Sequence, residues 1–264
     1  MATKYPLFPL YFAPMPMPTP MRLVRYLLSV LFVTSALSTS VAAENALTRF
    51  SDLPAGGLAP GSMWVHQPVG KIAPNTASIQ SSGSGKSYLQ IHSKGSASAW
   101  SHAVPVPING ATKLTWQWFV RGAPGRSQLN DKASDDFAAR LYVVFDYPLS
   151  KVPFGQRLGI RIARAIYGDL PAAALCYVWL PGGKAGELAP SPYTGRVKML
   201  VANSQASGSG WQRQQRDLLT DFQRAFGEEF GPGMPPIKAI VVSADTDQSG
   251  GQVDAAFADV VLGN

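Results

Sequence analysis

Alternation of apolar and polar residues is the strongest pattern in this chain, and it is clearest between residues 132 and 146. Successive side chains of a strand point to opposite faces. One predicted face is apolar and consists of Phe137, Ala139, Leu141, Val143 and Phe145. The other is mixed and consists of Asp136, Ala138, Arg140, Tyr142, Val144 and Asp146. Such a strand suits a sandwich of two sheets, in which one face packs and the other is open to solvent or a ligand.

The same alternation predicts further strands at 113–121, 174–180, 196–202, 237–243 and 255–262. In the first of these, Trp116 and Trp118 share a face with other apolar residues, which predicts core packing. Between 50 and 106, short apolar segments separated by Gly-, Ser- and Pro-rich turns predict several additional short strands.

The segment 152–167 has helical spacing instead. Its apolar residues recur every four positions, at Phe154, Leu158, Ile162 and Ile166, and its arginines cluster on another face. This predicts a short amphipathic helix that covers one end or edge of a sheet and exposes its basic face. The alternative is that the basic face binds an anionic ligand or a membrane surface.

A second short helix is predicted between Asp221 and Phe226. Thr220 and Gln223 have the spacing of a capping box, and Gly227 marks the expected end. Many short strands with one or two short helices predict an all-β fold. We expect a jelly-roll-like antiparallel β-sandwich, formed as a single domain by residues 44–264.

The first 43 residues have the organisation of an export signal behind a proline-rich upstream extension. Arg22 and Arg25 precede an apolar run at 26–37, and small residues follow up to Ala43. This order predicts a secretory signal peptide at 21–43. The apolar run is shorter than the roughly 20 residues that span a bilayer. We therefore expect a periplasmic or secreted protein, with no transmembrane anchor after signal cleavage.

Charge and cysteine content exclude some classes of partner and site. Without the first 43 residues, 20 basic residues face 16 acidic ones, so the net charge is +4 instead of +7. This balance gives no support for nucleic-acid binding. The single cysteine, Cys176, cannot form an internal disulfide, and no Cys/His cluster with zinc-ligand spacing occurs. No dinucleotide-binding fingerprint lies at a strand-to-helix junction, so no nucleotide cofactor is expected.

A candidate ligand-binding surface combines aromatic and charged residues of two predicted strands. Arg140 and Tyr142 lie two residues apart, close to Asp136, and Tyr177 and Trp179 have the same spacing. If the strands are neighbours, these side chains form an aromatic and guanidinium surface that suits a sugar ring. The alternative is a buried contact between sheet and helix, with Arg140 paired to Asp136 or Asp146.

Carboxylates also permit an enzymatic alternative. Two acids of Asp135, Asp136 and Asp146 could flank a glycosidic bond, as glycoside hydrolysis requires. An acidic pair before a strand is also typical of a turn in which carboxylates bind backbone amides. No Gly-x-Ser-x-Gly elbow supports hydrolysis by a serine nucleophile.

The segment 245–251 resembles the first half of a calcium loop. Asp245, Asp247 and Ser249 alternate before Gly250, and closely spaced oxygens of this kind suit a hard cation. The twelfth position of the loop is Ala256, where the helical calcium-binding hand has a glutamate. A metal-free hairpin turn is the alternative. No cofactor is required by the sequence, and a structural calcium is the ion that this pattern favours.

Several segments in one order resemble a bacterial family of unknown function, the domain-of-unknown-function family 3047. They are Leu114-x-Trp116-x-Trp118, residues 135–145, Tyr177-Val178-Trp179, Ser191-Pro192-Tyr193, Asp221-Phe222 with Ala225-Phe226-Gly227, and Asp245-Thr246-Asp247. The resemblance implies exported bacterial proteins with a jelly-roll sandwich similar to galactose-binding-like and carbohydrate-binding modules. It also implies a calcium ligand on the last strand, at Asp259.

Together these observations favour an exported, non-catalytic binding or cell-envelope protein that recognises a glycan or another envelope component. The alternative is a periplasmic, carboxylate-dependent hydrolase of the glycosidase type.

Overall fold

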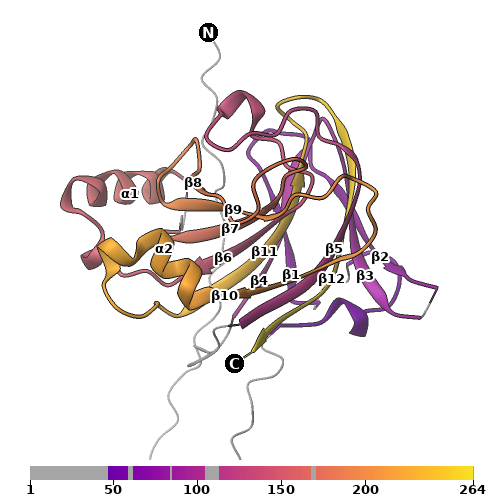
Figure 1. Cartoon of the computed structure of the whole chain (residues 1–264), viewed down its shortest axis with the longest axis horizontal. Helices are drawn as coiled ribbons and strands as arrows, with labels where there is room; N and C mark the ends of the chain where they lie inside the picture. The colour runs from indigo at the N-terminus through magenta and orange to yellow at the C-terminus, as the bar shows by residue number, and fades with distance from the viewer. Residues whose placement is uncertain (1–46, 59–61, 84, 105–112, 168–170, 264) are drawn as a thin grey trace, which may run out of the picture.

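The computed structural model describes residues 47–58, 62–83, 85–104, 113–167 and 171–263, which form two packed β-sheets (Figure 1). The predicted signal peptide and upstream extension, at 1–43, lie outside the described residues. Among the described residues, no helix is long and apolar enough to cross a bilayer. The all-β, jelly-roll-like sandwich predicted from the alternation is confirmed.

The larger sheet has seven strands in the order β1-β4-β11-β6-β7-β9-β8. Their bounds are β1 (Trp64–Pro68), β4 (Ala97–Ala103), β6 (Arg140–Phe145), β7 (Ala174–Trp179), β8 (Leu188–Pro190), β9 (Val197–Asn203) and β11 (Ile237–Asp245). All neighbours in this sheet are antiparallel except β7 and β9, which are parallel. The sandwich is therefore mainly, but not purely, antiparallel.

The smaller sheet has five strands in the order β10-β5-β12-β3-β2. Their bounds are β2 (Thr76–Ser81), β3 (Ser87–Lys94), β5 (Lys113–Ala123), β10 (Gln212–Asp217) and β12 (Gln252–Gly263). Three short 3-10 turns are η1 (Phe50–Asp52), η2 (Lys132–Ser134) and η3 (Leu149–Lys151). The two α-helices are α1 (Phe154–Tyr167) and α2 (Leu218–Phe230).

Aromatic side chains fill the space between the sheets. Trp116 and Trp118 of β5 are buried, as their alternation predicted, and they contact Tyr177 and Trp179 of β7. Phe257 of β12 packs against Trp118 from the same sheet. Large rings that meet edge-on or tilted provide much of the buried apolar area of this core.

The central strand was predicted to bury one face and to expose the other. The face that was predicted to be exposed is buried, so this part of the prediction for 136–146 is wrong. Leu141, Val143 and Phe145 belong to the core between the sheets. Tyr142 and Val144 lie in a second buried cluster on the other face of the same sheet. Its remaining buried members are Ala99, Phe137, Ala174, Cys176, Val178, Leu180, Met199, Val201, Ala239 and Val241.

Phe137 was expected to share a face with Leu141, but it packs with Tyr142 in the second cluster. The reason is that β6 begins only at Arg140, so the strand alternation does not extend back to Phe137. A two-residue period assigns faces only within continuous strand.

The strand β10 was not predicted, because its sequence is Gln-Arg-Gln-Gln-Arg-Asp and contains no apolar residue. It is an edge strand that pairs only with β5. Polar side chains are tolerated at such an edge, where one side of the strand faces water.

The helix α2 begins one turn earlier and ends later than predicted. Asp217, not Thr220, is the N-cap, and its carboxylate accepts a bond from the Thr220 N–H. The helix continues past Gly227 and ends at Phe230, followed by the C-cap residue Gly231, which has a φ of 89°. Phe230, beyond Gly227, packs against Tyr147 and Phe222, so burial of the apolar face extends the helix beyond the local stop signal.

Glycine at position 122 is required by both its backbone angle and its surroundings. Gly122 of β5 has a φ of +87°, and a Cβ there would lie 2.4 Å from the carbonyl oxygen of Gln252 on the neighbouring β12. Gly85 has a similar φ of +78° but open space around it. We expect Gly122→Ala to lower the free energy of unfolding by about 1–3 kcal/mol more than Gly85→Ala, because only the first substitution adds a steric clash. Urea denaturation of both variants measures this difference, and equal losses would contradict the prediction.

Candidate functional site

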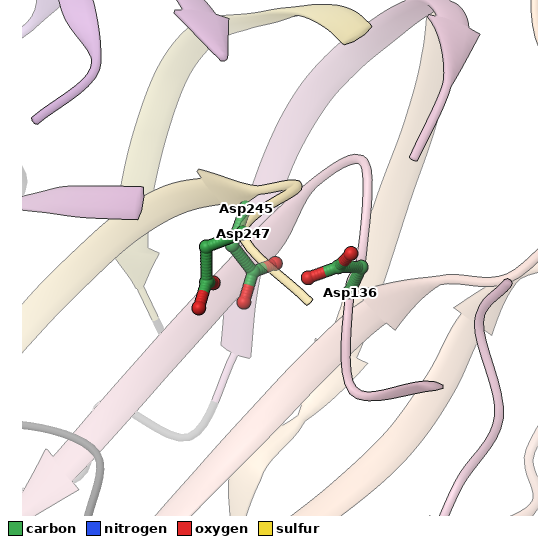
Figure 2. Close-up of side chains that lie close together, drawn as sticks. All are labelled: Asp136, Asp245 and Asp247. Atoms are coloured by element: carbon green, nitrogen blue, oxygen red, sulfur yellow. The ribbon is translucent and has the colours of Figure 1, made fainter. Parts of the chain in front are cut away.

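Three aspartates converge at one end of the seven-stranded sheet (Figure 2). Asp245 ends β11, Asp247 follows in the turn to β12, and Asp136 lies in the loop before β6. Because β11 and β6 are antiparallel neighbours with Ser243 opposite Arg140, the end of one strand meets the start of the other. One carboxylate oxygen of each aspartate lies within 4.8 Å of the other two. We call Asp136, Asp245 and Asp247 the aspartate cluster.

Arg140, the first residue of β6, is buried against this cluster. Its Nε donates to Asp245 Oδ1 at 3.1 Å and its Nη2 donates to Asp245 Oδ2 at 2.5 Å, which forms a bidentate pair. The Nη2 also donates to the Asp135 carbonyl at 2.5 Å and lies 3.3 Å from Asp135 Oδ2. The guanidinium stands 4.6 Å from the centre of the Phe137 ring. Arg140 therefore joins the loop before β6 to the end of β11.

Asp136 fastens the turn after β11 to the same loop. Its two oxygens accept the backbone N–H of Gln248 at 3.0 Å and of Ser249 at 2.6 Å. The Ser249 hydroxyl contacts both Asp136 Oδ2 and the carbonyl of Pro124. A hydroxyl has one proton, so it can donate to only one of these two acceptors.

Negative charge exceeds positive charge at this site. Burial raises the pKa of Asp245 to about 7, although Arg140 opposes the shift. The pKa of Asp247 is raised first by burial and second by the charge of Asp136, and the pKa of Asp135 is raised by burial. Among the described residues, Asp135 Oδ1 is buried without a hydrogen-bond partner. Asp135 and Asp245 pair with the one guanidinium, and Asp136 and Asp247 add two further carboxylates beside Asp245, an arrangement that favours uptake of a proton or a cation.

The aspartate cluster has the donor set of a hard divalent cation, since calcium takes several carboxylate and carbonyl oxygens. Asp247 is the most available ligand, because it is only partly buried and its carboxylate accepts a hydrogen bond from the side-chain amide of Gln248 at 2.5 Å. The structure brings together the predicted metal ligands Asp245 and Asp247, and it places Ser249 against Asp136. Asp136 was predicted from the sequence to bind a ligand, not a metal. In the structure it occupies the place beside Asp245 and Asp247 that was expected for a residue of the last strand.

That residue of the last strand, Asp259, lies apart from the aspartate cluster. Its two oxygens accept the N–H of Ser51 at 2.9 Å and the hydroxyl of Ser51 at 2.7 Å. The expectation that Asp259 joins the other acids is wrong, because its position on β12 brings it to η1 instead. This carboxylate links η1 to β12 of the sandwich.

The predicted aromatic and guanidinium surface does not form, although β6 and β7 are neighbours. Their register places Arg140 opposite Val178 and Leu141 opposite Tyr177. Residues that pair across a sheet share a face, so Tyr177 lies on the opposite face from Arg140. Tyr177 is fully buried between the sheets, where its hydroxyl donates to Asp221 at 2.9 Å.

The other predicted members of this surface are also buried. Trp179 is inaccessible and donates its indole N–H to the carbonyl of Gln205 at 2.9 Å. Tyr142 is 7% exposed and belongs to the second cluster. The proposed alternative, a buried Arg140 ion pair, describes the arrangement better, but its partners are Asp245 and Asp135 instead of Asp136 or Asp146.

The three acids of the hydrolase alternative do not gather. Asp135 and Asp136 precede β6, whereas Asp146 follows it and is exposed. A strand rises about 3.3 Å per residue, so the six residues of β6 separate the two ends by roughly 20 Å. Glycosidase carboxylates lie roughly 5–9.5 Å apart. Asp146 therefore cannot act across one bond with either acid of the pair.

A different aromatic group lies on the outer face of the five-stranded sheet, and we call Tyr88, Phe119 and Trp211 the outer aromatic patch. The Trp211 ring lies 5.2 Å from the Tyr88 ring and 6.1 Å from the Phe119 ring, measured between centroids. Trp211 is 41% exposed, and the other two are partly buried. The rings come from β3, from β5 and from the residue before β10.

Polar side chains surround this patch. Arg121 lies over the Phe119 ring at 5.6 Å, and Gln117 is paired with Arg213 across β5 and β10. All three polar residues are exposed. The signal in the sequence was Phe119 itself, a large apolar residue on the otherwise polar face of the 113–121 strand. Its partners could not be foreseen, because β10 and the strand order were unknown.

Comparison with solved structures gives similarities at low sequence identity. The chain is similar to the xyloglucanase domain of NopAA, a type three effector from Sinorhizobium fredii in complex with cellobiose, at 9% identity and a TM-score of 0.41, over 80% of this chain and 99% of that chain. It is also similar to the endoglucanase cel12A from Rhodothermus marinus, at 11% identity and a TM-score of 0.41, with the same coverage. The search of curated proteins gave no match.

A family described as "Protein of unknown function (DUF3047)" matches residues 62–261, a span that includes both sheets and the aspartate cluster. The chain therefore belongs to this family, as the order of its segments indicated.

Proposed function

We propose that the protein is an exported, non-catalytic binding protein that recognises a glycan of the cell envelope or its surroundings. The observation that carries this proposal is the outer aromatic patch, in which Trp211 stays 41% exposed while its ring contacts Tyr88 and Phe119. Aromatic rings that touch one another around a solvent-exposed tryptophan offer an apolar surface, and such a surface marks an interaction site.

The chemistry around the patch matches a sugar better than a purely apolar ligand. A pyranose ring has an apolar C–H face and a rim of hydroxyl groups. Gln117 supplies both a donor and an acceptor, and Arg121 and Arg213 supply several donors. Because these side chains lie on a sheet face, the surface suits a polysaccharide that runs across the strands.

The aspartate cluster gives less support to the hydrolase alternative. Asp136 is held by two backbone N–H groups, and Asp245 is held by Arg140 and by the Phe137 N–H at 2.8 Å. Carboxylates whose oxygens already accept several hydrogen bonds from the protein have few lone pairs left for the glycosidic oxygen or the water of a substrate. Retention without turnover is therefore the expected behaviour.

We also propose that the chain is exported by a signal peptide at 21–43 and that the aspartate cluster binds calcium as a structural ion. The excess of carboxylates over guanidinium supports the second proposal, and so does the position of Asp136, Asp245 and Asp247, since one carboxylate oxygen of each lies within 4.8 Å of the others. Calcium would be held by Asp136, Asp245 and Asp247, and it would fix the turn after β11. The ion would have a structural role and would not contact the outer aromatic patch.

We expect Trp211→Ala to weaken retention of the protein on insoluble polysaccharides by at least about tenfold, because large exposed aromatic residues dominate the binding energy of such surfaces. The measurement is a pull-down on a panel of insoluble glycans, with soluble products assayed in the same tubes. Trp211→Phe keeps an aromatic ring and should retain most of the binding.

The matched control is Val65→Ser, which alters another exposed apolar side chain, 56% accessible, in the other sheet. Equal retention of Trp211→Ala and the unaltered chain would overturn the assignment of the patch. Release of soluble sugars that disappears in Asp136→Asn would favour the hydrolase instead.

A further inference from the structure

The first two turns of helix α1 expose apolar residues that its sequence pattern predicts to be covered. Phe154 is 86% exposed and Leu158 is 65% exposed, so these two of the apolar residues that were expected to cover the sheet point to solvent. Figure 1 shows α1 at one side of the molecule, beyond the strands of the sandwich. Exposed Phe and Leu side chains on one helix stripe are unfavourable in water unless another surface covers them.

The inward side of α1 is held by polar contacts. Arg157 folds back along the chain, and its Nε and Nη2 each donate at 2.6 Å to the carbonyls of Val152 and Ser150. Gln156 lies 3.5 Å from Arg196 Nη1, and Ile160 packs against the main core. These contacts fix the rotation of the helix, so the exposure of Phe154 and Leu158 is a consequence of how α1 is anchored.

The exposed stripe also carries a positive charge. Arg161 is exposed and lies three residues after Leu158 and seven after Phe154, which places all three on one side of the helix, although the arginines were expected on another face. The sequence from 154 to 167 contains three arginines and no acidic residue. We call Phe154, Leu158 and Arg161 the α1 stripe.

We propose that the α1 stripe docks the protein on the surface of an anionic phospholipid bilayer. Helices that lie in a membrane interface combine apolar side chains, which enter the acyl boundary, with basic side chains that meet anionic headgroups. Gly155 and Gly159 flank the stripe, and open space surrounds both. No bulky side chain at these two positions would therefore hold the helix away from a flat surface.

Charge and size favour a bilayer over a second copy of the chain. Two copies that met through α1 would bring like charges together, which is destabilising. Two apolar side chains also supply far less than the roughly 800 Å² per partner of a stable protein interface. A bilayer can bind the α1 stripe without a surface of matching shape and without a specific partner side chain. The inference goes beyond glycan binding, because α1 and the outer aromatic patch share no residue.

The test is co-sedimentation of the chain from Glu44, which holds all of the described structure, with vesicles of phosphatidylglycerol and phosphatidylcholine. We expect binding to the mixed vesicles and little binding to pure phosphatidylcholine. Arg161→Gln should weaken binding about fivefold, and the double variant Phe154→Ser/Leu158→Ser should weaken it by at least about tenfold. Val65→Ser, at the exposed valine of β1, is the matched control and should bind normally.

A second measurement reports on the helix itself. A Leu158→Cys variant carries an environment-sensitive fluorophore, while Cys176 stays unlabelled because it is fully buried and burial raises the pKa of its thiol to about 12. Anionic vesicles should shift the emission of this label to the blue, and they should leave a label at Val65→Cys unchanged. Absence of binding to anionic vesicles, equal binding by the double variant, or an emission shift caused by self-association without lipid would each overturn the proposal.

Discussion

Replacement of Arg140 by alanine is expected to lower the free energy of unfolding by roughly 3–5 kcal/mol, because the buried Asp245 carboxylate loses its cationic partner. The guanidinium forms a bidentate pair with Asp245 and binds the Asp135 carbonyl, and both aspartates are buried. For a domain of this size, the loss corresponds to a decrease of roughly 6–20 °C in the melting temperature. Urea unfolding followed by tryptophan fluorescence measures it.

The loss should depend on pH, which separates it from a simple packing defect. Burial raises the pKa of Asp245 and of Asp135, so both acids are more easily protonated in the folded protein. At pH 5 a proton neutralises part of the charge that Arg140 leaves behind, and Arg140→Ala should be less harmful there than at pH 8. Arg213→Ala removes an exposed arginine and should change stability by less than about 0.5 kcal/mol. A loss below about 1 kcal/mol at pH 8 would contradict this view of the site.

In the presence of a chelator, the protein is expected to lose stability as the pH rises from about 4 to 7. Asp245 has a folded pKa of about 7, against about 3.9 in an unfolded chain. A raised carboxyl pKa means that the folded state binds the proton more tightly. Its stabilising effect is complete below the unfolded pKa and is lost as the pH passes the folded pKa. For Asp245 alone the change is on the order of 4 kcal/mol, and Asp247 adds to it in the same direction.

Calcium should reverse this loss, since a divalent cation relieves the same repulsion that a proton relieves. At pH 8, calcium at a hundredfold excess over its dissociation constant is expected to raise stability by about 2.7 kcal/mol. The increase should be smaller at pH 5, where protons compete for the carboxylates. Differential scanning calorimetry at both pH values, with calcium and with chelator, measures the effect.

Asp247→Asn is the informative variant for calcium, because Asp247 is the least engaged acid of the aspartate cluster. It should remove most of the calcium effect while leaving the Arg140 pair intact. Asp259→Asn is the matched control, since its carboxylate binds Ser51 and lies outside the cluster. Identical melting temperatures with calcium and with chelator at pH 8 would show that the turn is stable without a metal.

Local alternation predicted many strands of the sandwich, but it did not predict which faces of these strands are buried. Trp116 and Trp118 were expected in the core and are there, because a strand within one sheet of a sandwich has a fixed inside and outside. The polar strand β10 was not predicted, because an edge strand needs no apolar face and therefore shows no alternation of apolar and polar residues. Phe154 and Leu158 were expected to face a sheet that α1 covers, although the contacts of Arg157 and Gln156 turn Phe154 outward.

The candidate sites depended still more on tertiary structure. Asp245, Asp247 and Ser249 were recognised together because they occupy one turn, whereas Asp136 joined them only through the pairing of β6 with β11. The outer aromatic patch depends on the order of β3, β5 and β10, which no local spacing encodes. The sequence by itself thus determined the fold class and the strands with apolar faces, because side-chain period is a local property. Only the tertiary structure decided which polar and aromatic residues meet, because strand order and register are set by packing between distant segments.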